Sequence, residues 1–552
     1  MQIKYILSIM TCLLLMSGSC DGNNDNEDIT VPIPNNGEPT TYYISSSIGA
    51  DTNPGTSAAP WRTLDKINQV TFNPGDKILL KSGDSWNGPI TISSKFTGTE
   101  ILPIVISSYG EGNKPNIKAS TGTAILTINN SDYLQVENID IGNGPGYGLI
   151  FGVTDNKKHG NIKVKNVHVH DVPIAGIFFN DGKFNNYNID IVSCTADNVE
   201  MLFAISSGEN VNISDCVANN CIYGGFSIIS VKGGTIDNCK VLNCGTGNYP
   251  NGACGIFLGI NDGFVISNTE IAYQKRQADN PDAEAIDFER DNKNVTVKNC
   301  YMHDNDGCAI MFFDNMKGLV NEDCIIEDCV FENNSLNASS PRGFEISFSR
   351  LDCNNNGTIR NNTFKLNPGI QFITTVDPSV TVTGNKNDKG EPLELAYEAG
   401  ILIFNNAGFE VPALAEEYQY QPSGGYWTFR KNSGISVNGG AFNPPAIKEG
   451  KQIAFLQGDG EISNYIYLSA GSYKLSFSAA YRNSSGIGQG VAIYINNNKI
   501  GGDISLTSGT NFENYESDSF SVETGINLIE IRGTYTGDKT AFLDNINVKK
   551  LP

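Results

Sequence analysis

The 552-residue sequence has almost no long segment with the apolar spacing of an amphipathic helix. In place of such segments it has 58 glycines, frequent asparagine, and short apolar runs separated by turn residues. Hydrophobic residues make up 39% of the chain, which is enough for a substantial core. This combination excludes a helical bundle and predicts an all-β protein with many turns.

Positive charge is scarce as well. The chain has 38 lysines and arginines against 60 aspartates and glutamates, a formal net charge of −22. Because proteins that bind nucleic acid present a basic patch, this balance argues against a nucleic-acid partner. An acidic surface fits a neutral or cationic ligand, or a ligand that is held through metal ions. Nothing in the pattern indicates an oligomeric state.

An apolar run lies at the N-terminus. Lys4 precedes the apolar residues 5–16, and the small residues 17–19 follow them. The run is shorter than the roughly 20 residues that a helix needs to cross a bilayer. This order is typical of a signal peptide, which is predicted over residues 1–19.

Cys20 follows the predicted signal peptide directly. Small residues before a cysteine resemble the lipobox of bacterial lipoproteins. That motif also has a larger apolar residue at a fixed distance before the cysteine, and Leu15 would take this position only if the motif were shifted by one residue. The resemblance implies that Cys20 is lipidated and anchors a surface-exposed protein in the outer membrane; the alternative is a plain secretory signal. The acidic stretch DGNNDNED resembles the surface-export tracts of Bacteroidetes lipoproteins, and residues 20–40 are predicted to form a flexible tether.

Short strands then recur along most of the chain at a regular spacing. Val265, Val295 and Ile325 are 30 residues apart, and Ile213 and Ile236 are 23 apart. A repeat of 20 to 50 residues with irregular insertions is typical of a solenoid, in which each repeat is one coil.

The coils also repeat in their sequence. The segments AIDFERD, AIMFFDN and EISFSR begin at positions 285, 309 and 345 and align apolar residue to apolar residue. Insertions precede the second strand of a coil at 245–254, 274–285 and 334–343. Loops on one side of a solenoid form a rim that is usually the binding face.

Two ladders of residues follow the coil spacing. The polar one is predicted at coil corners, where asparagine adopts the bend and bonds to the next coil: Asn138, Asn166, Asp215, Asn238, Asn268, Asn299, Asp328 and Asn361. The next residue inward is often cysteine: Cys194, Cys216, Cys239, Cys300 and Cys329. Without Cys12 and Cys20, eleven of the thirteen cysteines remain, and no zinc pattern is present. The odd number and the spacing predict a buried stack of free thiols, in which an occasional disulfide is sterically possible.

Residues 49–92 carry a resemblance to a known family. The segments DTNPGT, PWRTLDK and PGDKILLKSGD resemble the N-terminal module of secreted, pectate-lyase-like right-handed parallel β-helix proteins. The resemblance implies a β-helix over residues 41–395. The amphipathic segment Trp61–Val70 is then expected to cover the open end of that helix, because an open end exposes an unpaired edge.

A second domain is predicted over residues 396–552. The stretches YKLSFSAAY and VAIYINN alternate as strands do when they bury one face. The order of the strands resembles a galactose-binding-like jelly roll, a β-sandwich found in many carbohydrate-binding modules. That resemblance implies a structural calcium ion held by the acids of its GFE and LDN motifs, here Glu410 and Asp544. The alternative is that both are ordinary surface acids.

The segment AIDFERD carries the predicted chemistry. Because Ile286 and Phe288 point into the coil, Asp287 and Glu289 point out, about 7 Å apart along the strand. The alignment places Glu345 on the same face, and these three are the predicted catalytic residues. Carboxylates on one face raise one another's pKa, so that one stays protonated while another is ionised, as glycosidic bond hydrolysis requires. The predicted substrate-binding residues lie at strand ends and in the rim loops: Glu284, Arg290, Asp314, Arg342 and Arg350.

The histidines have smaller predicted roles. His303 is expected at a solvent-facing corner. His168 and His170 alternate on a strand and are expected to be structural or on the surface. The polygalacturonase family uses carboxylates on a similar face, but this sequence lacks the NTD and GHG motifs of that family, so none of its residues is carried over.

Three functions are compatible with these residues. The first is a surface-exposed glycoside hydrolase that degrades a polysaccharide with the carboxylates on this β-helix face. The second is a polysaccharide lyase, which needs a base and a cation that neutralises a uronate; the candidates are Lys275, Arg276, Arg290, Arg342 and Arg350. The third is a non-catalytic protein that binds glycan on a β-helix scaffold.

Overall fold

The computed structural model describes residues 37–551 apart from gaps at 93–95, 181–185, 250–251, 278–281, 314–319, 337–343, 349–353, 368–369, 374–378, 394–396, 399–400, 403–405, 411–412, 415, 423–426, 448–449, 469, 484–487 and 524. The chain divides into two compact units, Met1–Glu332 with Asn356–Asn362, and Asn333–Asn355 with Thr363–Pro552. Among the described residues the fold is all-β, with a single helical element, the 3-10 helix η1 (Leu64–Gln69). None of the described helices has the length and apolar character needed to cross a membrane.

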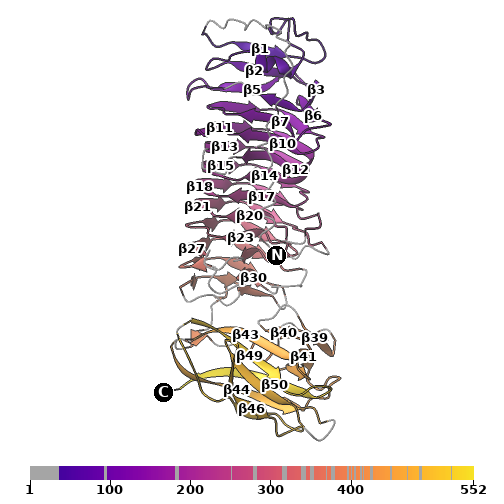
Figure 1. The fold of residues 1–552 in the computed structure, drawn as a ribbon, viewed down its shortest axis with the longest axis vertical. Helices are drawn as coiled ribbons and strands as arrows, with labels where there is room; N and C mark the ends of the chain where they lie inside the picture. Colours follow the sequence, from indigo (N-terminus) through magenta and orange to yellow (C-terminus); the bar gives the residue numbers. More distant parts are fainter. Residues whose placement is uncertain are drawn as a thin grey trace, which may run out of the picture. The chain divides into compact units, whose positions relative to one another are not determined.

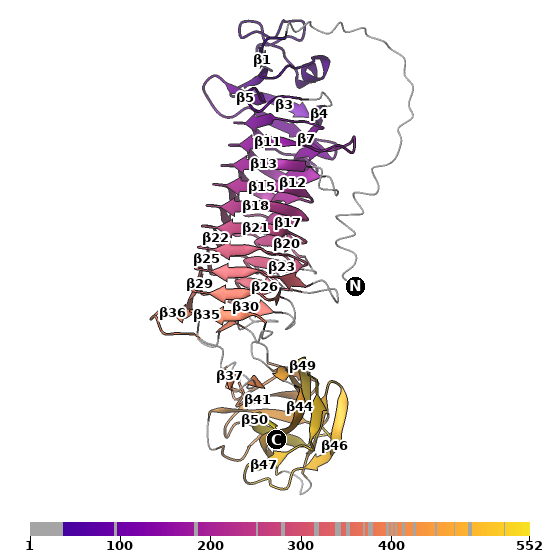
Figure 2. The same ribbon diagram turned by 90° about the vertical axis from the view of Figure 1, so that its left-hand side faces the viewer.

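The first unit is a stack of parallel coils, as the repeats predict (Figures 1 and 2). One sheet runs through β1 (Thr41–Ile44), β2 (Lys77–Lys81), β5 (Ile104–Tyr109), β8 (Leu134–Glu137), β11 (His159–Lys165), β13 (Asn186–Val192), β15 (Gly208–Ser214), β18 (Val231–Asp237), β21 (Asp262–Ser267), β24 (Thr296–Lys298), β28 (Ile325–Glu327) and β32 (Thr358–Arg360).

Two further rows of strands complete each coil. One row contains β3 (Ser85–Gly88), β6 (Asn116–Ala119), β9 (Asp140–Gly142), β16 (Val217–Asn219), β19 (Lys240–Leu242), β22 (Glu270–Ala272), β25 (Tyr301–His303) and β29 (Val330–Glu332). The other contains β4 (Ile90–Ile92), β7 (Ala124–Asn129), β10 (Tyr147–Gly152), β17 (Gly224–Ile229), β20 (Ile256–Gly259), β23 (Ile286–Arg290) and β26 (Ile310–Phe312). The long strands β12 (His168–Asn180) and β14 (Thr195–Ile205) belong to both rows.

The polar ladder turns the corners of the coils, as predicted. All eight of its members have a positive φ, between 50° and 59°. Asparagine and aspartate tolerate this left-handed conformation because their short side chains bond locally. The ladder also bonds from coil to coil: the Asn166 amide donates to Asn138 Oδ1 at 2.8 Å, and the Asn238 amide donates to Asp215 Oδ1 at 2.7 Å.

The register confirms most of the sequence alignment and corrects one position. Ile286 pairs with Ile310, and the rings of Phe288 and Phe312 stack with centroids 4.6 Å apart. Val265, however, pairs with Thr296 and not with Val295. Val295 lies one residue before β24, where its carbonyl accepts from the Ile325 amide at 2.8 Å. A buried valine directly before a strand therefore shifted the predicted register by one residue.

The N-terminal segment packs into the first unit. Trp61 is fully buried and stacks on Tyr42 with ring centroids 4.9 Å apart. Leu64 and Ile67 of η1 are buried too, whereas its charged residues face outward. The segment is amphipathic as predicted, and its helical part is the 3-10 helix η1.

The cysteines form a buried stack of thiols, also as predicted. The ten cysteines that the structure describes are all free and buried. The amide of Cys194 donates to Cys216 Sγ at 3.3 Å, and the amide of Cys216 donates to Cys239 Sγ at 3.5 Å. Cys12, Cys20 and Cys353 lie outside the described residues.

This stack leads to a direct test. Purified protein that is denatured without reductant is expected to show at least ten reactive thiols per chain in a thiol titration. A parallel sample reduced before denaturation gives the total. A titration that finds most thiols oxidised in the unreduced sample would contradict the stack.

The second unit contains a β-sandwich. One antiparallel sheet contains β39 (Tyr418–Tyr420), β41 (Ser433–Val437), β42 (Gln452–Gln457), β50 (Thr540–Lys550), β44 (Gly471–Tyr481), β47 (Glu513–Glu516) and β48 (Phe520–Val522). The other contains β40 (Thr428–Arg430), β43 (Glu461–Leu468), β49 (Gly525–Gly533), β45 (Gly490–Ile495) and β46 (Asn498–Ser505). Both sheets contribute to one apolar core, which includes Leu475, Ile493 and Leu543.

The second unit also contains short strands outside the sandwich: β30 (Phe344–Phe348), β33 (Thr363–Lys365), β34 (Gln371–Ile373), β35 (Thr381–Thr383), β36 (Lys386–Asn387), β37 (Tyr397–Glu398) and β38 (Ile401–Leu402). Of these, β30 pairs with β34 and β33 with β36 in parallel, as strands of a coil do. The predicted domain bounds, 41–395 and 396–552, stay predictions.

Candidate active site

Four carboxylates gather at the N-terminal end of β23: Asp282, Glu284, Asp287 and Glu289, here called the acid cluster. Ile286 and Phe288, which alternate with Asp287 and Glu289 along the strand, are fully buried, as predicted. Asp287 and Glu289 are only partly exposed, and Asp287 Oδ1 is buried with no hydrogen-bond partner among the described residues. Glu284, predicted in a rim loop, is also buried.

Backbone hydrogen bonds fix the segment that leads into β23. The Ala283 amide donates to Ala253 O of the preceding coil at 2.9 Å, and the Gly255 amide donates to Glu284 O at 2.9 Å. The following coil adds a bond from the Gly307 amide to Ala283 O at 3.0 Å. Ala283 itself has φ = 94°, a conformation that costs a non-glycine residue of order 1–3 kcal/mol and is often found near active sites. The two acids on either side of Ala283 are therefore held by both neighbouring coils.

The inserted loop 245–254 approaches the acid cluster closely. Gly252 has φ = 102°, and a β-carbon at this position would overlap the Asp282 carboxylate. Only glycine lets the loop adopt this conformation and leaves room for the acid. The predicted rim is therefore in contact with the predicted site.

A β-bulge changes the direction of β23 at Glu289. Leu258 pairs with Phe288, whereas the next residue, Gly259, pairs with Arg290. Glu289 is thus the extra residue, which has no partner position on β20. Bulges near active sites re-aim a side chain, and this one separates Glu289 from the regular ladder.

Electrostatics distinguish Asp287 from an ordinary surface acid. Burial raises the pKa of Asp287 well above its ordinary value, and the carboxylates of Glu289, Glu284 and Asp282 raise it further. Among the described residues, every charge that shifts this pKa is a carboxylate. Burial and the neighbouring carboxylates therefore both favour the protonated form of Asp287.

Two tyrosines and a glutamate that the sequence analysis did not select lie beside the acid cluster. Burial raises the pKa of Tyr223 well above its ordinary value, and the charges that raise it further include Asp287 and Asp282. The rings of Tyr223 and Tyr249 pack edge to face with centroids 5.0 Å apart, and the Tyr249 hydroxyl donates to Glu200 Oε1 at 2.8 Å. Tyr249 lies in the inserted loop 245–254, and this insertion is the feature of the sequence that could have identified it.

The buried Cys254 also faces the acid cluster. Burial raises the pKa of its thiol well above the ordinary value, and the charges of Asp287 and Glu284 are the next causes. A thiol in such surroundings stays neutral and is a poor nucleophile. Catalysis by Cys254 is therefore disfavoured.

The remaining predicted site residues are placed as follows. Arg290 is buried, with 6% of its surface exposed. Glu345 belongs to the second unit and is fully buried, where its Oε2 accepts from the Asn334 side-chain amide at 2.6 Å. Asp314, Arg342 and Arg350 lie outside the described residues.

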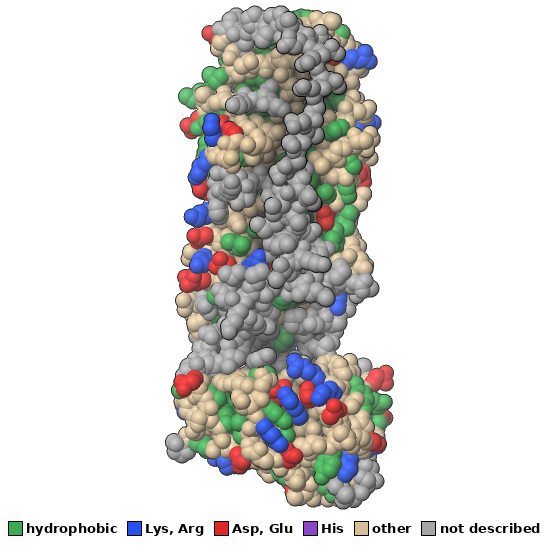
Figure 3. Space-filling model, viewed as in Figure 1, with side chains coloured by type: hydrophobic (Ala, Val, Ile, Leu, Met, Phe, Trp, Pro, Cys, Tyr) green, Lys and Arg blue, Asp and Glu red, His purple; other side chains and the backbone are tan. Residues whose placement is uncertain are grey.

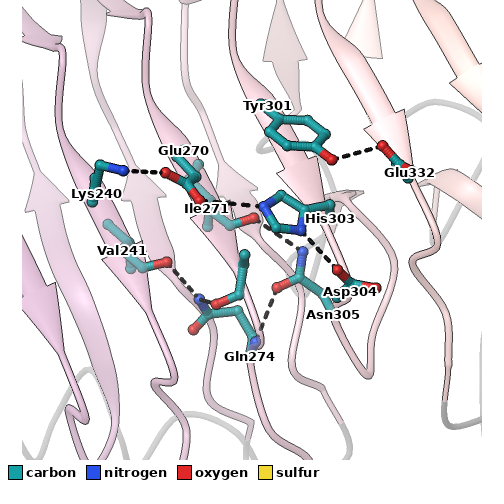
Figure 4. A network of polar contacts seen from close by, with 11 residues as sticks. Lys240, Val241, Glu270, Ile271, Gln274, Tyr301, His303, Asp304, Asn305 and Glu332 are labelled. Atoms are coloured by element: carbon teal, nitrogen blue, oxygen red, sulfur yellow. Dashed lines mark hydrogen bonds and ion pairs between the residues drawn. The ribbon is translucent and has the colours of Figure 1, made fainter.

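His303 is not at a solvent-facing corner, contrary to the expectation. Only 7% of its side chain is exposed, and its ring stacks on Tyr301 with centroids 4.1 Å apart. Its Nδ1 lies 2.8 Å from Asp304 Oδ2, and its Nε2 lies 3.4 Å from Glu270 Oε1 (Figure 4). Tyr301 of the same strand and Tyr273, which follows β22 of the preceding coil, cover the ring, and the imidazole is part of a coil-to-coil polar network.

Both predicted calcium ligands belong to the second unit, Glu410 in the loop that contains Gly408 and Asp544 in β50. Glu410 Oε1 accepts from the amides of Lys451 and Gln452 at 2.7 and 3.1 Å. Asp544 is buried and its Oδ1 accepts from the Asn545 amide at 2.8 Å. Gly408 of the same loop lies against Asp544 Oδ1. Carboxylate oxygens suit calcium, so the donor type fits, and Glu410 and Asp544 would hold the ion if it binds.

Removal of calcium is therefore expected to lower the melting temperature of the full chain. Asp544→Ala should abolish the response to a chelator, because it removes a buried oxygen donor. Glu523→Ala, which changes an exposed acid of the same unit, is the matched control and should keep the response. A melting temperature that does not respond to chelator in the unchanged protein would contradict the calcium prediction.

Comparison with known proteins agrees with the fold. Residues 185–329, which include the acid cluster, match the family model of the right handed beta helix region. The chain is 35% identical over 135 residues to a lacto-N-biosidase of Bifidobacterium longum subsp. longum. This match spans 24% of the chain and only 8% of that protein.

Solved structures show the same architecture. The lacto-N-biosidase of family GH136 from Eubacterium ramulus aligns with a TM-score of 0.50 at 19% identity, over 63% of this chain and 68% of the other. An alginate lyase from Paenibacillus sp. aligns with a TM-score of 0.39 at 13% identity, over 64% of this chain and 97% of the other. At 19% identity the likeness to the Eubacterium ramulus structure shows the β-helix fold alone.

Proposed function

We propose that the protein is a glycoside hydrolase whose general acid is Asp287. The observation that carries the proposal is the buried Asp287 oxygen among three other carboxylates, which raise the pKa of Asp287 together with burial. A carboxylic acid that stays protonated near neutral pH can donate its proton to the oxygen of a leaving group. The acid cluster also supplies three further carboxyl groups, those of Asp282, Glu284 and Glu289.

The roles follow from two-carboxylate glycosidase chemistry. Asp287 protonates the glycosidic oxygen as the bond to the anomeric carbon breaks. Glu289, re-aimed by the bulge, is the second carboxylate: it either takes a proton from the attacking water or attacks the anomeric carbon itself. The paired rings of Tyr223 and Tyr249 offer apolar faces against which a sugar can pack.

The comparisons support this reaction class. Two of the proteins that the chain resembles, one by sequence and one by structure, are named lacto-N-biosidases. A lacto-N-bioside is therefore the first substrate to test, and other glycans follow. The lyase alternative has less support, because it requires a cation beside the acidic sugar, and the described charges that act on Asp287 are all negative.

A glycan panel tests the proposal. The full chain is incubated with lacto-N-biosides and with neutral and uronate polysaccharides. New reducing ends without ultraviolet absorbance from an unsaturated sugar are expected, and nuclear magnetic resonance of the first product gives the anomeric configuration. Product that absorbs would replace the hydrolase with a lyase. Binding without any product would support the non-catalytic scaffold.

The sandwich is proposed to hold the glycan. Acidic and basic side chains lie side by side on the face shown in Figure 3. On the sheet of β43 and β49 a polar pocket is lined by residues that include Lys431, Glu461, Tyr494 and Arg532. The Arg532 guanidinium lies over the Tyr494 ring at 4.1 Å, and Lys431 Nζ lies 2.6 Å from Glu461 Oε1. Paired charges and an aromatic ring suit a neutral, hydroxyl-rich ligand.

We also propose that the protein is anchored to the outer membrane through Cys20. The support is the sequence order of Lys4, the apolar run and the small residues before Cys20. Cys20→Ala is expected to move the protein from the membrane fraction to the soluble fraction, because the lipid attachment point is lost. Cys12→Ala is the control and should leave the distribution unchanged. Membrane association that persists in Cys20→Ala would contradict the anchor.

A further inference from the structure

A second group of ligating side chains lies on the first unit, on different strands from the acid cluster. Asp140 of β9 and both His168 and His170 of β12 place one ligand atom each within 4.8 Å of one another. All three side chains are partly exposed. The alternation of the two histidines, which suggested only a structural or surface role, thus brings both imidazoles to one carboxylate.

The strand register explains how the three meet. His168 pairs with Asp140, and His170 pairs with Gly142, in parallel strands of neighbouring coils. Residues two apart on a strand project from the same face, so both imidazoles lie on the side of Asp140. A β-carbon at position 142 would overlap the His170 ring, so glycine leaves the space that this imidazole occupies. The ring reaches across, and its Nε2 lies 3.4 Å from Asp140 Oδ2.

Neighbouring side chains orient each ligand. His168 Nδ1 lies 2.8 Å from Thr195 Oγ1, and His170 Nδ1 lies 2.7 Å from Asp171 Oδ2. With Nδ1 engaged on both rings, the Nε2 atoms are the ones left for a metal. Asp140 Oδ2 accepts from the Asn116 side-chain amide at 2.6 Å. Metal-binding histidines are commonly held in this way, with the second ring nitrogen bonded to an oxygen.

We propose that Asp140, His168 and His170 bind a divalent cation of the zinc type. Two imidazole nitrogens and one carboxylate oxygen are a common ligand set of zinc, and partial exposure leaves a position for water. Asp171 and Asp197 add negative charge around the group: Asp171 contacts His170, and Asp197 pairs with it in the strand register. Lys114 opposes them, but its ammonium donates to Asn166 Oδ1 at 2.9 Å. The ion would join two successive coils and so stabilise the folded chain.

Cobalt(II) is a suitable probe because its absorption reports the ligands. The full chain, without an affinity tag, is titrated with Co²⁺, and Zn²⁺ is then added as competitor. One equivalent is expected to bind with the visible absorption of a nitrogen- and oxygen-ligated ion, to be displaced by Zn²⁺, and to raise the melting temperature. His168→Asn and His170→Asn should each abolish all three signals.

Two further variants separate the site from general effects. His159→Asn is the matched control, because His159 also bonds to two aspartates, Asp132 and Asp155, but has no second histidine nearby. It should bind Co²⁺ as the unchanged protein does. Gly142→Ala keeps every ligand but displaces the His170 ring, so it should weaken binding at least tenfold.

Three outcomes would overturn the proposal. They are the absence of Co²⁺ binding at micromolar protein concentration, binding that survives in the His168→Asn, His170→Asn double variant, and absorption typical of thiolate ligation, which would assign the ion to cysteines. None of them depends on an assay of glycan cleavage, so this site and the proposed hydrolase fail or stand separately.

Discussion

Replacing Asp287 with asparagine is expected to lower turnover at least about a hundredfold on the glycan that the protein cleaves. An amide cannot supply the proton that the leaving group needs, and general acid–base catalysis contributes roughly 10²- to 10⁴-fold. Glu289→Gln should cause a loss of similar size, because it removes the second carboxylate. The measurement is kcat at saturating substrate for each variant.

The two variants should remain folded, which makes the loss interpretable. Asp287 and Glu289 project away from the apolar interior formed by Ile286 and Phe288, so neither change removes a core contact. Asp287→Asn replaces a protonated carboxyl with a neutral amide of similar size, and Glu289→Gln removes one of the negative charges that act on Asp287. We therefore expect a melting temperature equal to or slightly above that of the unchanged protein.

A matched control is available on another sheet. Asp190 is an exposed aspartate of β13 whose carboxylate accepts from Asn212 at 3.1 Å. Asp190→Asn should leave kcat unchanged. Full activity in both Asp287→Asn and Glu289→Gln would show that the catalytic residues lie elsewhere in the chain.

The fold was largely predictable because its determinants are local and repeated. Asparagine or aspartate at most of these corners adopts a left-handed bend that most residues avoid, and the same residue types recur from coil to coil. Apolar residues at every second position mark a strand. The one-residue error at Val295 arose where a buried residue directly precedes a strand, since burial alone does not show which residue begins the ladder.

The candidate site was only half predictable. The alternation of apolar and polar residues along β23 identified Asp287 and Glu289, because the direction in which each side chain points depends only on its own strand. The burial of Asp287 depends on the surrounding loops, and Tyr223 comes from a coil that is distant in sequence. His303 was misplaced for the same reason: the Tyr273 ring and the Glu270 carboxylate that contact it come from the preceding coil. Periodicity places a residue on a face but does not show what covers that face.

Raising the pH through neutrality is expected to destabilise the second unit, and Glu345 is the reason. This carboxyl is fully buried, and burial raises its pKa to about 7 from its ordinary value of 4.5. Because the folded-state pKa is the higher one, the folded chain holds the proton more tightly than the unfolded chain does. The associated stability is complete below pH 4.5 and is lost as the pH rises through about 7.

The size of the effect follows from the separation of the two pKa values. At 1.36 kcal/mol for each pH unit between them, ionisation of Glu345 costs about 3 kcal/mol of unfolding free energy. For a unit of this size, that corresponds to a fall in melting temperature of roughly 5–10 °C. Glu345→Gln removes the titrating group, so its melting temperature should change little with pH over the same range. Glu523→Gln, which changes an exposed acid of the same unit, should keep the fall.

The same variant tests the catalytic prediction for Glu345. At a pH of about 5 the unchanged protein and Glu345→Gln should both be folded, so a difference in kcat there cannot come from stability. If Glu345 only fills a buried position bonded to Asn334, Glu345→Gln should leave kcat unchanged. If Glu345 is a catalytic acid, the same substitution should lower kcat about a hundredfold. If instead the melting temperature of Glu345→Gln falls with pH as steeply as that of the unchanged protein, another buried group carries the pH dependence, and the assignment to Glu345 is wrong.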